Sequence, residues 1–507
     1  MLKALVFLSI LAIIFAIPRG FDISDEGVYA LLAVPSQENI GGIFNYDLFF
    51  KLLYKFTGLE FGIIGLRVIR LISYFIGAFG LVIFWKNLFE NQRLSFSLFL
   101  LALSGLFAGY GFLPPTLSYN SISVVAVCMW LALISKKELN LWDLLFLGFV
   151  FSVLFYAKIT VCFLLVPFTV VYLLVKRLVS IGAIMLISLP FLLFEGLFYS
   201  LFQESGLTRL TGEFGFLNQR QDYSILLLIK YTATGGFWVF LGGMFFISSA
   251  VAKKYGYKIY YLILILGIFT IGIVFHTTFI YSDWSHSFLL ITFAGICWLL
   301  GTLNFNEFNK DEWFFILILI FLPFLLHFGS NVYWMRLGIH YWIFWLLTLA
   351  ILIRKKSPKF HFNFHFFASF CSFVLVIFGC WITPYEGVHL WQSDHVWEYQ
   401  PGKEIMISEQ QVTFLEELKS EVNASDSTRI VSLFRNPGVL YLLGKTSPYS
   451  PSYWKPSQAR LFFQDGNELD MILFNDLEKF PFDLSKWPNQ KVLIEPNGGN
   501  LLILWKN

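Results

Sequence analysis

The sequence predicts a polytopic α-helical membrane protein of about 13 transmembrane helices with a small C-terminal α/β domain outside the membrane. Of its 507 residues, 57% are hydrophobic and only 14% are charged, whereas a soluble chain carries about 25% charged residues. The shortfall extends over most of the length, which excludes a soluble protein with a single anchor. The formal net charge of +3 gives no electrostatic reason to expect a nucleic-acid partner.

The transmembrane helices are predicted from apolar runs that approach the roughly 20 residues needed to cross a bilayer. The first run is followed by Pro-Arg-Gly-Phe and not by a small-residue cleavage site, so we interpret it as a retained helix. Two later runs meet at Lys158. The predicted spans are residues 2–17, 61–84, 95–113, 120–135, 141–157, 159–175, 179–198, 234–251, 259–280, 287–303, 313–329, 338–353 and 366–383.

Basic residues set the predicted orientation, because loops rich in Lys and Arg stay in the cytoplasm. Alternate loops hold basic pairs such as Lys136-Lys137 and Lys176-Arg177, and the opposite short loops hold scattered basic residues. The N-terminus is therefore expected in the cytoplasm, and an odd number of spans places the C-terminus outside. We expect the bacterial inner membrane, with the C-terminal domain in the periplasm.

The composition divides the chain into a transmembrane domain, residues 1–383, and an extracytoplasmic α/β domain, residues 384–507. In the second part charged residues are frequent again, and Pro and Gly occur at intervals between short apolar runs. Short apolar runs at 429–434 and 491–494 predict strands, and 409–422 predicts a helix. Roughly 120 residues are enough for a separate core. All five cysteines lie in apolar runs, which predicts neither a disulfide framework nor a zinc site.

The first outer loop, residues 18–60, holds the most informative pattern in the chain. Asp25 and Glu26 are adjacent carboxylates just beyond the first helix, and Gly27 and the aromatic Tyr29 follow them. Further along the same loop, residues 43–56 mix large apolar side chains with charged ones. This mixture predicts an amphipathic helix that lies in the membrane interface.

Three short motifs give the chain a family resemblance: Asp25-Glu26-Gly27, the arginine-containing segment 66–71 and Ala157-Lys158. With them, the chain resembles the GT-C superfamily of membrane glycosyltransferases, and within it the branch of protein O-mannosyltransferases and the lipid A aminoarabinose transferase. The resemblance extends as architecture over most of the chain. It implies inverting transfer of a sugar from a polyprenyl-phosphate-linked donor to a hydroxyl of a lipid, glycan or protein acceptor at the outer face.

The candidate residues suit that chemistry. An acceptor hydroxyl is a weak nucleophile and needs a carboxylate to take its proton, so Asp25 is the candidate catalytic base. Glu26 and Tyr29 are candidates for binding the substrate. The departing lipid phosphate needs cations, whose effect is stronger at a low-dielectric membrane edge. Lys158, between two apolar spans, is the first candidate for that phosphate, and Arg67 and Arg70 come next.

Each candidate residue also has a structural interpretation. An acidic pair in a polar loop is usually solvated, and Lys158 could extend along a helix end toward water. Arg67 and Arg70 lie three apart on one helical face, where packing or lipid head-group contact would equally explain them. Several relatives carry a second Asp near Tyr119-Asn120, and this chain has no carboxylate there.

Two other functions compete with glycosyl transfer. A transporter or flippase for lipid-linked glycans would favour repeated halves, broken helices in matching positions and charges near the bilayer midplane, whereas the charges here lie at the outer edge. A glycan polymerase or ligase usually relies on Arg and His in a large outer loop, and residues 199–233 contain Arg209 and Arg220 without His. No cofactor is certain and no metal ligand is assigned. A divalent cation stays open, because a single Asp-Glu pair does not define a coordination site.

Overall fold

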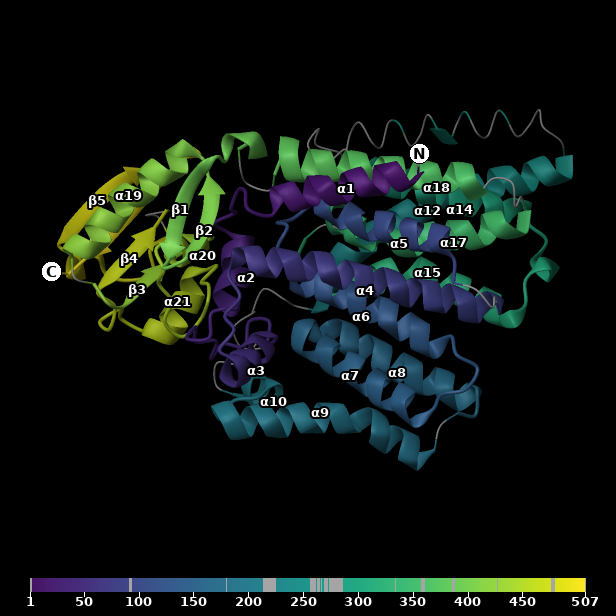
Figure 1. Cartoon of the computed structure of the whole chain (residues 1–507), viewed down its shortest axis with the longest axis horizontal. Helices are drawn as coiled ribbons and strands as arrows, with labels where there is room; N and C mark the ends of the chain where they lie inside the picture. Colours follow the sequence, from purple (N-terminus) through teal and green to yellow (C-terminus); the bar gives the residue numbers. More distant parts are fainter. Residues whose placement is uncertain are drawn as a thin grey trace.

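The protein is elongated, with a bundle of helices along its long axis and a region of strands at one end (Figure 1). The computed structural model describes residues 2–90, 94–178, 180–212, 225–255, 286–332, 334–356, 361–384, 388–425, 427–475 and 479–506, and the single positions 261, 265, 267, 268 and 272.

The bundle consists of long apolar helices that agree closely with the predicted spans. Each predicted span except 259–280 corresponds to one helix, and 259–280 lies outside the described residues apart from isolated positions. The long helices are α1 (Leu2–Ala16), α4 (Ile63–Phe89), α5 (Phe96–Phe107), α6 (Tyr119–Ile134), α7 (Leu141–Ala157), α8 (Ile159–Val175), α9 (Ile181–Phe202), α12 (Ile225–Tyr255), α14 (His286–Thr302), α15 (Lys310–His327), α17 (Trp342–Lys356) and α18 (His361–Val376).

Four helical segments in the described part are long and apolar enough to cross a membrane: Ile63–Phe89, Ile181–Phe202, Gly338–Lys355 and Asn363–Ile382. Six further apolar helices, of 10–17 residues, are shorter. The total of about 13 spans, set by the roughly 20 residues that each crossing needs, therefore stays a prediction.

The outer surface of the bundle is apolar. Phe15 is 62% exposed, Phe163 61% and Ile181 76%. Large apolar side chains exposed on several helices suit lipid as the surrounding solvent.

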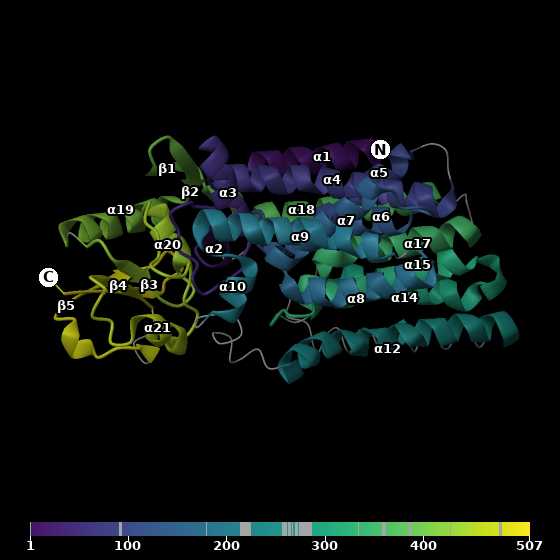
Figure 2. The same cartoon turned by 90° about the horizontal axis from the view of Figure 1, so that it is seen from below.

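Three short helices lie at the end of the bundle that faces the strands (Figures 1 and 2). They are α2 (Asp25–Leu32), α3 (Asp47–Thr57) and α10 (Gly206–Thr211). The helix predicted over 43–56 is confirmed as α3, whereas α2 falls within a segment for which no helix was predicted. A fourth short helix, α16 (Trp334–Leu337), precedes α17.

Residues 388–506, here called the C-terminal region, contain strands and helices as predicted. The elements are β1 (His395–Gln400), β2 (Lys403–Ile407), α19 (Glu409–Ala424), β3 (Ile430–Ser432), α20 (Pro437–Leu442), α21 (Pro456–Phe463), β4 (Met471–Phe474), β5 (Asn489–Ile494) and β6 (Asn500–Trp505). β1 and β2 form an antiparallel pair, and the other strands form one sheet in the order β3-β4-β6-β5. β3 and β4 are parallel, and the remaining pairs are antiparallel.

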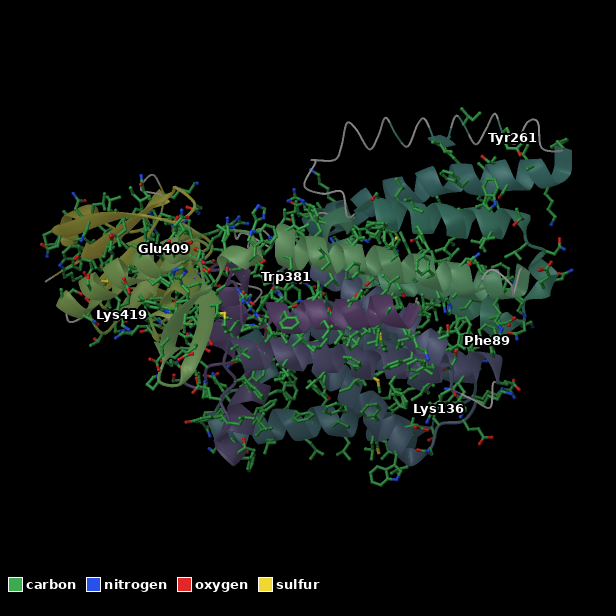
Figure 3. The ribbon with its side chains drawn as sticks, turned by 45° about the horizontal axis from the view of Figure 1, so that its top comes forward. Phe89, Lys136, Tyr261, Trp381, Glu409 and Lys419 are labelled. Carbon is green, nitrogen blue, oxygen red and sulfur yellow. The ribbon has the colours of Figure 1, made fainter. Side chains whose placement is uncertain are left out.

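Labelled side chains mark the two ends of the molecule in Figure 3. Phe89 and Lys136 lie at the end remote from the strands, and Glu409 and Lys419 lie on the C-terminal region. The short helices α2, α3 and α10 lie at the end of the bundle nearest the C-terminal region (Figures 1 and 2), and α2 contacts α20.

Candidate functional site

The helix that carries Asp25 is fixed at its start by an aspartate that the sequence reasoning did not single out. The Asp22 carboxylate accepts hydrogen bonds from the Ser24 N–H (2.9 Å), the Ser24 hydroxyl (2.8 Å) and the Glu26 N–H (2.9 Å). It thereby satisfies N–H groups that the first turn of α2 cannot bond internally. The Asp-x-Ser spacing is the signal that could have predicted this turn.

Asp25 stands at the exposed edge of an otherwise buried helix. It is half-buried, whereas every later residue of α2 is buried. Val28, Tyr29 and Leu32 follow it by three, four and seven positions and share its helical face. This face packs against a cluster that includes Ala157, the last residue of α7. Asp25 therefore begins the face of α2 that is directed toward Lys158.

Two aromatic contacts continue the connection between α2 and Lys158. The Tyr29 ring lies 6.3 Å from the rings of both Phe44 and Tyr119, and Phe44 stacks on Tyr119 at 4.2 Å. The Lys158 ammonium nitrogen lies 5.3 Å from the centre of the Tyr119 ring. Tyr29 is thus part of an aromatic cluster that reaches Lys158, and its substrate-binding role stays a prediction.

Lys158 is a buried cation whose hydrogen-bond partners are all uncharged. It links α7 to α8 and is 6% exposed. Its ammonium donates to the Leu326 carbonyl (2.5 Å) and to Asn120 Oδ1 (3.5 Å). Among the described residues it forms no ion pair. A buried charge without a counter-charge is unfavourable, so a bound anion would stabilise this position.

A small cavity, with a volume of about 60 Å³, lies beside Lys158. We call it the lysine cavity. Its wall combines aromatic rings with small and polar residues, a composition typical of ligand pockets. The lining residues are Gly42, Phe44, Asn45, Tyr119, Phe155, Tyr156, Ala157, Lys158, Ile159, Thr160, Leu210 and Gly329.

Asn120 adds an unused donor next to Lys158. It is 1% exposed, and its Oδ1 lies 3.3 Å from the Tyr341 hydroxyl, which donates to it. Its Nδ2 is buried and has no hydrogen-bond partner among the described residues. Such a donor normally has a partner, and an oxygen atom of a ligand would supply one. Sequence reasoning noted Asn120 only as a missing carboxylate.

Glu26 points away from the lysine cavity and is fully engaged with α4. Its carboxylate accepts from Arg67 Nε and Nη2, both at 2.9 Å, and from the Asp22 N–H at 3.1 Å. The Thr116 hydroxyl donates to the same carboxylate. Glu26 and Arg67 are each 1% exposed. These contacts support a structural role for Glu26, which also lines a second cavity described below, and its substrate contact stays a prediction.

The two arginines of α4 also donate hydrogen bonds to backbone carbonyls of other segments. Besides Glu26, Arg67 donates to the carbonyls of Ile17 (2.7 Å), Arg19 (2.8 Å) and Gly20 (2.7 Å). These bonds tie the start of the first loop to α4. They occupy a guanidinium that the sequence offered, after Lys158, as a further candidate for the phosphate, and that role stays a prediction.

Arg70 is equally engaged. It donates to the carbonyls of Pro114 (2.5 Å) and Gly109 (2.9 Å) and to the Tyr74 hydroxyl (3.2 Å). Its guanidinium carbon lies 4.2 Å from the centre of the Tyr110 ring. This side chain braces the segment before α6 and is 0% exposed, so a phosphate would have to displace existing contacts to reach it.

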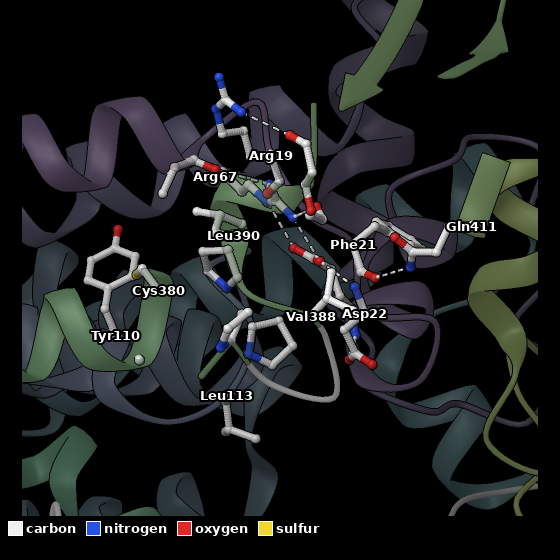
Figure 4. A pocket seen from close by; sticks show the side chains of 18 residues that line it. Arg19, Phe21, Asp22, Arg67, Tyr110, Leu113, Cys380, Val388, Leu390 and Gln411 are labelled. Atoms are coloured by element: carbon white, nitrogen blue, oxygen red, sulfur yellow. Dashed lines mark hydrogen bonds and ion pairs between the residues drawn. The ribbon is translucent and has the colours of Figure 1, made fainter. Parts of the chain in front are cut away.

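A second small cavity, of about 40 Å³, lies on the Glu26–Arg67 side of α2 (Figure 4). Arg19 stands in its wall and donates from Nη1 to the Ser393 carbonyl (3.0 Å). The floor is formed partly by Pro114 and Cys380. We call this space the arginine cavity. Glu26 of α2 thus lines this cavity, whereas the described lining of the lysine cavity includes no residue of α2.

The lysine cavity is covered by α10, which is fastened to α3 by a buried ion pair. Arg209 donates to Asp47 from Nη1 (2.6 Å) and Nη2 (2.9 Å) and to Glu204 from Nε (3.0 Å). Burial alone would raise the pKa of Asp47, but Arg209 and Lys51 outweigh it and lower that pKa. Leu210, the next residue of α10, lines the cavity.

Glu195 reinforces the same cover. It accepts from the Tyr156 hydroxyl (2.5 Å) and from the Leu207 N–H (3.2 Å). Tyr156 lines the lysine cavity, so Glu195 ties the wall of the cavity to its cover. No group of three or more His, Cys, Asp or Glu side chains that could hold a metal ion occurs within the described part of the chain.

Comparisons with solved structures show a similarity of fold. No protein-family model and no curated protein matches the chain. The fold is similar to the crystal structure of ArnT from Cupriavidus metallidurans bound to undecaprenyl phosphate, with a TM-score of 0.45 and 11% sequence identity. The similarity covers 100% of this chain and 98% of that one.

Proposed function

We propose that the protein is an inverting, GT-C-type glycosyltransferase that moves a sugar from a polyprenyl-phosphate-linked donor to a hydroxyl of a lipid, glycan or protein acceptor. One observation supports this proposal most strongly. The half-buried Asp25 carboxylate lies on the face of α2 that leads, through Tyr29 and Tyr119, to the buried Lys158 beside a cavity. A base and an anion-binding cation that are linked by one aromatic cluster suit displacement of a phosphate by a hydroxyl.

The proposed reaction uses Asp25 as the general base. The acceptor oxygen forms a bond to the anomeric carbon as the bond from that carbon to the phosphate oxygen breaks. The acceptor proton passes to the Asp25 carboxylate, and the bond electrons leave with the polyprenyl phosphate. Attack on the face opposite the phosphate inverts the anomeric centre. A carboxylate in this position typically contributes about 10²–10⁴-fold to the rate.

Lys158 and Asn120 are proposed to receive the departing phosphate. The charge on the leaving oxygen grows in the transition state, and fixed donors in a low-dielectric site stabilise it. The ammonium of Lys158 supplies the charge, and the unused Nδ2 of Asn120 supplies a directed hydrogen bond. Arg67 and Arg70 are assigned to holding the backbone around the site, and Glu26 to pairing with Arg67.

The proposal includes a placement in the membrane. We propose that the bundle lies in a bacterial inner membrane with its N-terminus in the cytoplasm and its C-terminal region in the periplasm. The cavities then lie at the outer boundary between water and lipid. A polyprenyl chain can stay in the bilayer there while its phosphate reaches Lys158, and a polar acceptor can approach from water.

The proposal is tested by measuring the release of free polyprenyl phosphate, which is the product whatever the sugar. Purified protein in liposomes is supplied with lipid extract from the source membrane and an acceptor fraction, and polyprenyl phosphate is quantified by mass spectrometry. Asp25→Asn should lower the rate by at least about 100-fold. Asp394→Asn, which alters a 61% exposed side chain in an ion pair with His395, should leave the rate unchanged.

Two results would reject the proposal. Release at the wild-type rate by Asp25→Asn would show that Asp25 is not the base. Movement of lipid-linked glycan across the liposome membrane by the wild-type protein, without release of polyprenyl phosphate, would identify a transporter instead.

A further inference from the structure

Two glycines bring α2 and the C-terminal region into direct backbone contact. Gly27 lies in α2 and Gly438 lies in α20. A Cβ atom added to Gly27 would meet the Gly438 nitrogen at 2.2 Å and its Cα at 2.4 Å. A Cβ added to Gly438 would meet the Ile23 Cα at 2.6 Å. Side chains essentially never approach backbone this closely, so the contact requires glycine at both positions.

A hydrogen bond fixes the position of this contact. The Gly438 N–H donates to the Ile23 carbonyl over 2.7 Å. Ile23 immediately precedes Ser24 and Asp25, so the bond holds the chain two residues before the candidate base. Because a hydrogen bond is directional, it restrains the orientation of the α2 N-terminus as well as its distance from α20.

The rest of the first loop is also attached to the C-terminal region. Gly20 N–H donates to the Met406 carbonyl, and Met406 N–H donates to the Pro18 carbonyl, both over 2.8 Å. Beyond α2, the Gln37 side chain donates to the Ser447 carbonyl over 2.6 Å and accepts from the Ser447 N–H over 3.0 Å. The segment that contains Asp25 is therefore fastened on both sides.

Apolar side chains complete the attachment. Phe21, Ala30, Leu31 and Val34 belong to the same buried cluster as the core of the C-terminal region. In contrast, Val28 and Leu32 belong to the cluster on the lysine-cavity side. One face of α2 is thus part of the core of the C-terminal region, and the face that carries Asp25 is part of the site.

We infer that the C-terminal region positions the candidate base, and that Gly438 is a positioning residue that acts through its backbone contact with Gly27. This inference rests on the proposed function of Asp25. An eight-residue helix has little stability of its own, so its position is set by what it packs against. A displacement of about 1 Å can lower a reaction rate by about 100-fold.

The test compares two alanine substitutions in the C-terminal region of the full-length protein. Gly438→Ala forces α20 away from α2. Gly498→Ala is the matched control. Gly498 has a φ of +84°, and an added Cβ would have no atom within 4 Å. Alanine there therefore strains the backbone without contacting α2. We expect Gly438→Ala to lower kcat about 10- to 100-fold, with the KM for the polyprenyl-phosphate donor changed by less than about twofold because Lys158 is undisturbed.

Amide hydrogen exchange provides a second readout that does not depend on activity. The N–H groups of residues 25–32 should exchange faster in Gly438→Ala than in wild type, with α7 unchanged and Gly498→Ala like wild type. Gly27→Ala should reproduce the effect. The double variant should add little to either single variant, since both disturb one contact.

The outcomes separate the two proposals. Unchanged exchange in α2 and an unchanged kcat in Gly438→Ala would overturn the positioning role. An equal loss of kcat in Gly498→Ala would also overturn it, because general destabilisation would then explain the loss. If wild-type protein releases no polyprenyl phosphate, the proposed function fails, and the exchange comparison still decides whether Gly438 positions α2.

Discussion

Substitutions in the Glu26–Arg67 pair can distinguish residues that stabilise the fold around the site from residues that contact the substrate. Glu26 is the neighbour of the candidate base in sequence, and a substrate contact is the function that its position suggested. In the structure it is 1% exposed and bonded to Arg67 at 2.9 Å through both of its oxygens. We therefore predict that Glu26→Gln acts mainly on stability.

The magnitude follows from the contacts that the substitution breaks. The carboxylate accepts four hydrogen bonds, two from Arg67, one from the Asp22 N–H and one from the Thr116 hydroxyl. Glutamine has one carbonyl oxygen, so its amide group would face donors, and the guanidinium would lose its counter-charge. Removing one partner of a buried ion pair costs about 3–5 kcal/mol. That is a large share of the total of about 5–15 kcal/mol that stabilises a typical domain.

The assay is thermal unfolding of the detergent-solubilised protein, followed by tryptophan fluorescence. Glu90→Gln is the control, because Glu90 and Lys137 form an ion pair that is 68% and 75% exposed. An exposed pair contributes about 0–1 kcal/mol, so the control should unfold close to wild type. Combining Glu26→Gln with Arg67→Met should cost less than the sum of the single effects, because the double variant leaves no unpaired buried charge.

A specific result would refute this reasoning. If Glu26→Gln unfolded within about 0.5 kcal/mol of wild type and still lost release of polyprenyl phosphate, Glu26 would act on the substrate. The structural role of the pair would then be wrong.

Three further predictions concern the lysine cavity. Lys158→Met should weaken binding of a polyprenyl phosphate by about 10- to 100-fold, the value of a charge-assisted hydrogen bond, as measured by native mass spectrometry; unchanged affinity would contradict the phosphate role. Asn120→Asp should also weaken that binding, because the new carboxylate would pair with Lys158 and repel phosphate; tighter binding would contradict it. The pKa of Asp47 is lowered in the folded protein. The ionised Asp47 therefore contributes its full stabilisation above the ordinary aspartate pKa of about 3.9, and this stabilisation is lost as the pH falls through the lower folded-state pKa. Asp47→Asn should thus lower the unfolding temperature at pH 7 and reduce its dependence on pH below about 4; equal acid sensitivity in both proteins would contradict the Asp47–Arg209 assignment.

Much of the helical architecture could be predicted, because apolar runs and capping residues are local signals. The helix expected over 409–422 is α19, which ends at Ala424. The junction of two spans at Lys158 is also confirmed, since α7 ends at Ala157 and α8 begins at Ile159. The strand expected over 429–434 is shorter in the structure, where β3 covers Ile430–Ser432.

The site could be predicted only in part. Asp25 and Lys158 stand out because charge next to an apolar span is unusual. The partners of Arg67 and Arg70 could not be predicted, since they are mainly backbone carbonyls of distant segments, including Ile17 and Pro114. A carbonyl group leaves no signal in the sequence, so a structural arginine and a phosphate-binding one look alike.

The helix α2 and its support were also beyond sequence reasoning. Eight residues with a glycine inside give a weak helical signal. Gly438 lies more than 400 positions from Gly27, and one sequence contains no evidence that they meet. The connection between the first loop and the C-terminal region is a property of the folded chain alone.

The most direct test of the account is an experimental structure of the protein with a polyprenyl phosphate bound. We predict a phosphate oxygen within about 3.2 Å of Lys158 Nζ, a second oxygen accepting from Asn120 Nδ2, and the Asp25 carboxylate on the side where an acceptor would approach. A phosphate bound instead beside Arg19 in the arginine cavity, without contact to Lys158, would contradict it.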